Sequence, residues 1–74
     1  MTNRNALEDK VQKSGYRLDF ICEKIGITYQ SWLNKIKNIS EFKQSEIVKL
    51  AKLLNLSQDE INVIFFDYES DSES

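Results

Sequence analysis

The sequence contains no histidine, no proline, one cysteine and only two glycines among its 74 residues. Without histidine, the chain lacks the commonest general base and the commonest metal ligand of proteins. A single cysteine excludes both an internal disulfide and a cysteine-based zinc site. We expect the protein to be no enzyme and to bind no cofactor or metal, because the remaining residues assemble no catalytic or ligating constellation.

Long apolar runs are also absent. No segment approaches the ~20 apolar residues that cross a bilayer, and the N-terminal MTNRNALEDK has no apolar centre of a signal peptide. These absences predict a cytoplasmic protein without a membrane partner.

The absence of proline, together with abundant strong helix formers, predicts an all-α fold. A chain of this length forms one domain that buries roughly 60% of its unfolded surface, enough for a modest core and no deep cleft. We place the domain at residues 1–68. Residues 69–74 contain only serine and acidic side chains, and we expect this tail to be disordered.

Five helices are predicted from the spacing of apolar residues and from capping residues. The first runs from about Ala6 to Lys13, with Asn5 as its N-cap, and the fourth from about Gln44 to Leu54. The fifth has the clearest start, because SQDE at residues 57–60 is a capping box. Its apolar stripe runs through Ile61, Ile64 and Phe65, with Tyr68 as a further candidate member.

The second and third helices lie within LDFICEKIGITYQSWLNKIK, residues 18–37. Leu18, Ile21, Cys22 and Ile25 form one apolar stripe, so Cys22 is expected to be buried. Gly26 can end a helix in a left-handed conformation. Ile27 then follows as a buried contact, and the Thr28 hydroxyl can cap the next helix. This order of helix, glycine turn and polar helix is typical of the helix-turn-helix, which inserts its second helix into the DNA major groove.

Charge is distributed unevenly around the net value of −2. Residues 1–40 carry seven basic and four acidic side chains, whereas residues 41–74 carry three basic and eight acidic ones. The half that holds the predicted turn motif is therefore basic, as a DNA contact requires.

The third helix presents Trp32 and Ile36 toward the core and polar side chains on the opposite side, because each residue advances the helix by ~100°. Glutamine and asparagine can bond an adenine edge with a donor and an acceptor, lysine can reach guanine or phosphate, and the first turn suits phosphate contact. The predicted DNA-binding residues are Thr28, Gln30, Ser31, Asn34, Lys35 and Lys37.

Two residues of the same helix favour a different partner. Leu33 and Tyr29 place an apolar and aromatic patch on or near the exposed face, a feature typical of protein-binding surfaces. If the turn holds one more residue, Leu33 and Ile36 instead become the core pair.

The segments IGITYQSWLNKIKN and SEIVKLAKLLNLSQDEINVIFF resemble the small Cro/CI-type helix-turn-helix regulators of temperate phages of Gram-positive bacteria. The likeness covers about residues 7–66 and implies a five-helix lambda-repressor-like DNA-binding domain. Such a domain acts at a lytic/lysogenic switch in the bacterial host by binding double-stranded operator DNA. By position, the resemblance assigns DNA contacts to Thr28, Gln30, Ser31, Asn34 and Lys35. The sequence departs from the family pattern at Cys22, Leu33 and Asn38.

Similar switch regions encode antirepressors, called modulators of repression, that bind the DNA-binding domain of the partner repressor. An acidic chain with the patch formed by Tyr29, Leu33 and Asn34 fits this alternative, because an acidic surface complements a basic DNA-binding face. For the DNA-binding hypothesis we expect a homodimer on a palindromic site, with Val63 and Phe66 as the dimer patch if they are exposed.

Overall fold

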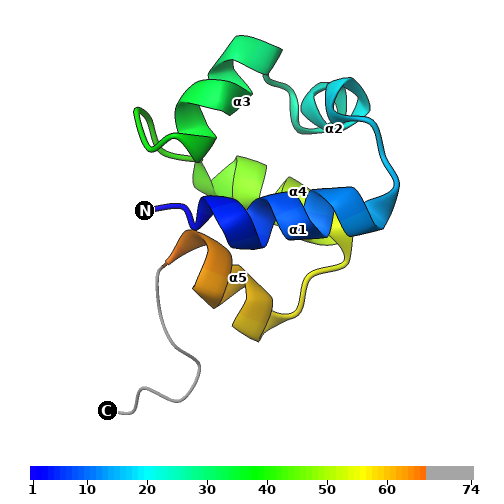
Figure 1. Ribbon diagram of the computed structural model, residues 1–74, viewed down its shortest axis with the longest axis vertical. Helices are drawn as coiled ribbons and strands as arrows, with labels where there is room; N and C mark the ends of the chain where they lie inside the picture. The colour runs from blue at the N-terminus through cyan, green and yellow to red at the C-terminus, as the bar shows by residue number, and fades with distance from the viewer. Residues whose placement is uncertain (67–74) are drawn as a thin grey trace.

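The computed structural model describes residues 1–66, which form five α-helices and no strand. The predicted acidic tail and Tyr68 lie outside the described residues. The helices are α1 (Arg4–Ser14), α2 (Leu18–Ile25), α3 (Tyr29–Ile36), α4 (Gln44–Leu54) and α5 (Gln58–Phe65). In Figure 1, α1 crosses the front of the domain and α4 lies behind it, with α2 and α3 on one side and α5 on the other. The predicted all-α fold class is confirmed.

The N-terminal residues connect two distant parts of the chain. The Thr2 backbone N–H donates to Asn38 Oδ1 at 2.7 Å, and Asn38 Nδ2 donates back to the Thr2 carbonyl at 3.1 Å. The Asn3 N–H donates to the carbonyl of Ile64 at 2.6 Å, near the end of α5. The first three residues are therefore held between the turn that follows α3 and the end of α5.

This anchoring corrects the predicted start of α1. The N-cap is Asn3, whose side chain accepts the N–H of Ala6 at 3.1 Å, so the helix begins two residues before the expected position. Asn5 lies inside the helix instead of capping it. Both asparagines suit a cap, and the bond from Asn3 to the end of α5 favours the earlier one.

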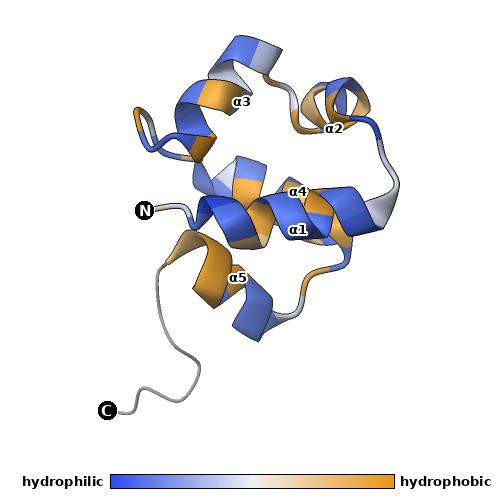
Figure 2. Ribbon diagram, viewed as in Figure 1, coloured by the Kyte–Doolittle hydropathy of each residue, from blue (hydrophilic) through white to orange (hydrophobic). Residues whose placement is uncertain are grey.

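The core joins one fully buried side chain from each of several helices: Leu7 of α1, Ile21 of α2, Leu50 of α4 and Ile64 of α5. Burial of each such side chain stabilises the fold by roughly 1.5–3 kcal/mol. Figure 2 shows hydrophobic residues alternating with hydrophilic ones along the helices, as amphipathic helices require. Cys22 is buried as predicted, at 4% exposure.

Three aromatic rings extend this core to α3. The rings of Trp32 and Phe42 meet edge to face with centroids 5.6 Å apart, and Phe42 meets Phe65 in the same way at 5.4 Å. Edge-to-face pairs of this kind add about 0.5–1.5 kcal/mol beyond the area they bury. The predicted inward direction of Trp32 and Ile36 is confirmed, since both are buried.

The turn between α2 and α3 has the geometry that the sequence predicted. Gly26 has φ +84°, and its N–H donates to the carbonyl of Cys22 at 2.9 Å. The hydroxyl of Thr28 accepts the N–H of Ser31 at 3.1 Å and so caps α3. Ile27 between them is partly buried and packs against the core. These bonds fix the direction in which α3 leaves the turn.

The starts of the last two helices are fixed by glutamates three residues into each. Glu46 accepts the backbone N–H of Lys43 at 2.9 Å, and Glu60 accepts that of Ser57 at 2.8 Å. Ser57 Oγ accepts the N–H of Glu60 in return, which confirms the capping box predicted for α5. Within residues 1–66, none of the helices is both long enough and apolar enough to pass through a bilayer.

Candidate macromolecular interface on helix α3

The outer side of α3 carries most of the residues that the sequence predicted. Thr28, Gln30 and Lys37 are exposed, and Ser31 and Asn34 are partly exposed. The two amides lie one turn apart, with Gln30 Nε2 donating to Asn34 Oδ1 at 3.3 Å. Ser31 and Thr28 are already bonded to each other in the N-terminal cap. The structure therefore leaves these polar side chains at least partly accessible to solvent, with Gln30 and Asn34 side by side.

Lys35 does not belong to this surface. Its exposure is only 6%, its Nζ lies 3.2 Å from Oε1 of Glu46, and it donates to the carbonyl of Glu41 at 3.0 Å. The ammonium also lies 5.8 Å from the ring centroid of Phe42. Lys35 is therefore not accessible in this structure for the DNA contact predicted from the sequence, because its ammonium group pairs with Glu46 of α4 inside the domain.

An apolar groove runs beside α3. It has a volume of about 280 Å³ and lies where α3 faces α1 and the start of α2. Leu33 is partly buried and packs against the core, whereas Tyr29 at the groove is 55% exposed. We define the α3 groove by its lining residues, which are Arg4, Glu8, Val11, Gln12, Leu18, Tyr29, Trp32, Leu33 and Ile36.

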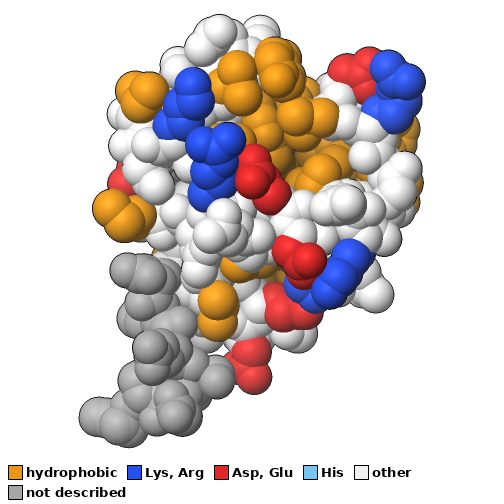
Figure 3. Space-filling model, viewed as in Figure 1, with side chains coloured by type: hydrophobic (Ala, Val, Ile, Leu, Met, Phe, Trp, Pro, Cys, Tyr) orange, Lys and Arg blue, Asp and Glu red, His pale blue; other side chains and the backbone are white. Residues whose placement is uncertain are grey.

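Figure 3 shows hydrophobic side chains gathered on this side of the molecule, between α3 and α2 and above α1. An exposed apolar hollow next to a polar helix face is a common feature of protein-binding surfaces. The Tyr29–Leu33 patch predicted from the sequence is therefore one wall of a larger concave surface.

The contribution of α1 to this groove was not predicted. Leu7 and Val11, four residues apart, form a narrow apolar stripe on α1, of which Leu7 is fully buried and Val11 lines the groove. At the rim, Arg4 Nε lies 3.2 Å from Glu8 Oε2, so the charges beside the groove offset each other. The narrow stripe of α1 was the available signal, but the sequence does not show which helix α1 faces.

Most of the positive charge in the first half of the chain is neutralised locally. Five of the seven basic side chains in residues 1–40 form ion pairs, namely Arg4, Lys10, Lys13, Arg17 and Lys35. Lys24 lies 5.4 Å from the ring centroid of Phe20, and Lys37 is exposed at the end of α3. The excess of positive charge expected from the sequence therefore does not accumulate on the outer side of α3.

A second exposed aromatic group, also missed from the sequence, lies along α2. The rings of Tyr16 and Phe20 have centroids 5.1 Å apart, with exposures of 43% and 36%. Lys24, one turn later, places its ammonium over the ring of Phe20. Tyr16 lies in the connection that leads into α2, outside the apolar stripe of that helix.

Metal-binding and nucleophilic groups are scarce among residues 1–66. Residues 1–66 contain no group of three or more histidine, cysteine or acidic side chains placed to hold a metal ion. Burial raises the pKa of the Cys22 thiol, and the negative charge of Asp19 raises it further. Because a thiolate is the reactive form, Cys22 is held in its unreactive state.

Comparison with known proteins adds no relative to this description. The chain matches no protein-family model, no curated protein sequence and no solved structure.

Proposed function

We propose that the protein is a small regulator of a lytic/lysogenic genetic switch that acts as an antirepressor. In this proposal α2, the turn at Gly26 and α3 form a helix-turn-helix within a five-helix lambda-repressor-like domain. The α3 groove then binds the DNA-binding domain of a partner repressor and blocks its access to the operator. The function depends on protein contact, with no catalysis and no cofactor.

The observation that carries the proposal is the composition of the α3 groove. A concave apolar surface containing an exposed tyrosine suits a protein partner, because aromatic residues dominate the energy of protein interfaces. DNA affinity depends instead on phosphate attraction. On α3, burial of Lys35 leaves Lys37 as the exposed lysine. The surface therefore has the chemistry of a protein contact more than that of a phosphate contact.

The test is binding to the repressor encoded in the same switch region, measured by co-purification and calorimetry. Tyr29→Glu introduces a charge into the groove at a side chain that is already 55% exposed, so the fold should survive. Loss of a hot-spot residue costs about 2 kcal/mol or more, so Tyr29→Glu should lower the affinity about thirtyfold or further. Val48→Glu, at a residue of α4 that is 46% exposed, is the matched control and should leave affinity unchanged. Equal affinities for Tyr29→Glu and the parent protein would contradict the proposal.

Sequence-specific DNA binding is the second candidate, favoured by the polar row of Thr28, Gln30, Asn34 and Lys37 on α3. An anisotropy titration with a duplex from the chain's own promoter region tests it. Affinity should fall steeply with added salt, and Lys37→Gln should reduce the slope of that dependence by ~1. The absence of specific binding at low salt would exclude this candidate.

The two candidate functions differ in which substitutions should weaken binding. Tyr29→Glu weakens a repressor complex through lost apolar contact, whereas Gln30→Ala and Asn34→Ala weaken readout of base edges. A protein that binds the repressor but shows no salt-sensitive DNA complex acts as an antirepressor.

A further inference from the structure

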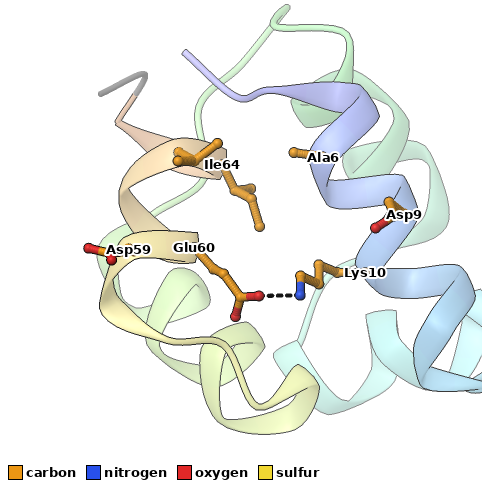
Figure 4. A pocket seen from close by; sticks show the side chains of 7 residues that line it. Ala6, Asp9, Lys10, Asp59, Glu60 and Ile64 are labelled. Carbon is orange, nitrogen blue, oxygen red and sulfur yellow. Dashed lines mark hydrogen bonds and ion pairs between the residues drawn. The ribbon is translucent and has the colours of Figure 1, made fainter. Parts of the chain in front are cut away.

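A second hollow lies on the other side of α1, between α1 and α5 (Figure 4). It has a volume of about 220 Å³, and its apolar residues are Ala6 of α1 with Val63 and Ile64 of α5. Ile64 is buried, whereas Ala6 and Val63 are partly exposed. We name it the α1–α5 pocket. None of its lining residues also lines the α3 groove, so the two surfaces can be tested separately.

The α1–α5 pocket places Val63 apart from Phe66. Phe66 lines a third hollow, between α4 and α5, so the two residues predicted to form a dimer patch line different hollows. Val63 therefore belongs to the α1–α5 pocket and not to a surface shared with Phe66.

Charged residues surround the apolar floor of the α1–α5 pocket. Figure 4 shows the ion pair between Lys10 and Glu60, which joins α1 to α5 along one edge. Asp9 and Asp59 are the other two charged lining residues, and both are acidic. The lining thus carries three carboxylates and one ammonium, a net charge of −2.

The two aspartates are available to an incoming cation. Within residues 1–66, Asp59 forms no ion pair or hydrogen bond through its side chain. Among the described residues, Asp9 pairs only with Lys13, whose side chain is 71% exposed. An exposed ion pair within one helix turn contributes little to stability, so Lys13 is readily displaced. Glu60, in contrast, is occupied by Lys10, and this hydrogen bond lowers the pKa of its carboxyl group.

We propose that the α1–α5 pocket is a docking site for a basic segment of a partner protein. An aliphatic side chain of that segment enters between Ala6 and Val63, while flanking lysine or arginine side chains contact Asp9 and Asp59. The apolar floor supplies affinity, and the acidic lining favours a partner segment with positive charge. The inference does not depend on the function proposed for the α3 groove.

The probe is a short synthetic peptide with leucines flanked by lysines, titrated into the isotope-labelled protein while amide shifts are recorded. A peptide of the same pattern with glutamates in place of lysines is the control ligand. We expect the lysine peptide to shift the amides of Ala6, Val63 and Ile64 and the glutamate peptide to shift none of them. Added salt should weaken the lysine complex, because exposed charges are screened.

Two matched variants locate the site. Asp59→Asn removes one carboxylate of the pocket, and Glu23→Gln removes one exposed carboxylate of α2 that lies outside it. Loss of one exposed charge contact should weaken peptide binding by about 1.5-fold to fivefold for Asp59→Asn, whereas Glu23→Gln should have no effect. Ala6→Leu fills the floor without changing charge and should also weaken binding, with circular dichroism confirming that the helices remain.

Three results would overturn the inference. Shifts centred away from α1 and α5 would place the peptide elsewhere. Equal weakening by Asp59→Asn and Glu23→Gln would show attraction to net charge alone. Concentration-dependent self-association that disappears in Asp59→Asn would show that a second copy of this chain, and no basic partner segment, occupies the pocket.

Discussion

The burial of the Lys35–Glu46 pair allows a direct test of how α3 is held. Replacing Lys35 with methionine keeps a long apolar stem but leaves the carboxylate of Glu46 without its cation in a site where both side chains are at most 10% exposed. Removal of one partner of a buried ion pair costs about 3–5 kcal/mol. A domain of this size has a total stability of only ~3–10 kcal/mol. Lys35→Met should therefore remove much of the free energy of unfolding.

Urea denaturation followed by circular dichroism measures this loss. With a slope near 1 kcal/mol per molar urea, the midpoint should fall by about 3 M or the variant should be unfolded without denaturant. Lys49→Met is the control, because Lys49 is an exposed lysine of α4 without an ion pair in the described region, and its loss should change stability by less than ~0.5 kcal/mol.

The decisive measurement is the double variant. Glu46→Gln can still accept the backbone N–H of Lys43, and it removes the charge that Lys35→Met leaves unpaired. Adding Glu46→Gln to Lys35→Met should restore roughly 0.5–3 kcal/mol, a coupling typical of residues in contact. A cost below ~1 kcal/mol for Lys35→Met, or strictly additive losses in the double variant, would refute this account. Lys35 would then return to the set of candidate DNA contacts.

Three further predictions follow from single side chains. Because the hydrogen bond from Lys10 lowers the pKa of Glu60, this carboxylate stabilises the folded chain above the ordinary glutamate pKa, and its contribution is lost as pH falls through the folded value. In urea titrations, Glu60→Gln should thus be less stable than the parent at neutral pH and equal to it in strong acid; a pH-independent difference would contradict this. Asn38 has φ +64°, and its side chain bonds Thr2. Asn38→Ala should therefore lower stability through the lost bonds and through about 1–2 kcal/mol of left-handed backbone strain, whereas Asn38→Gly should lose only the bonds. Equal thermal midpoints for the two variants would argue against the strain. The thiol of Cys22 should react with a disulfide reagent in urea but hardly at all in buffer, and rapid labelling of the folded protein would show that the site opens.

Much of the fold was predictable because its signals are local. The apolar stripe ending at Gly26, the Thr28 cap and the Ser57 capping box each depend on residues within a few positions, and the structure has all three. The start of α1 was not predictable, because Asn3 and Asn5 are equivalent as caps and a bond to distant Ile64 decides between them.

The candidate site was less predictable, since it depends on contacts between elements. The sequence placed Lys35 among the polar DNA-binding candidates, but the side chain is buried against Glu46, which lies on another helix. Similarly, Val11 of α1 forms part of the α3 groove because of how α1 crosses the domain, which no pattern within α1 specifies. Gln30 and Lys37, whose environment is solvent, were placed correctly on the exposed side.

The pairing of Thr2 with Asn38 and of Asn3 with Ile64 bears on how the protein should be handled. A protease that trims the first three residues would remove the groups that bond the N-terminal segment to Asn38 and to Ile64. The damage would reach the turn after α3, so a binding defect in a trimmed preparation would have a conformational origin. Preparations for interaction studies therefore need their N-terminal mass verified before any loss of affinity is assigned to a surface residue.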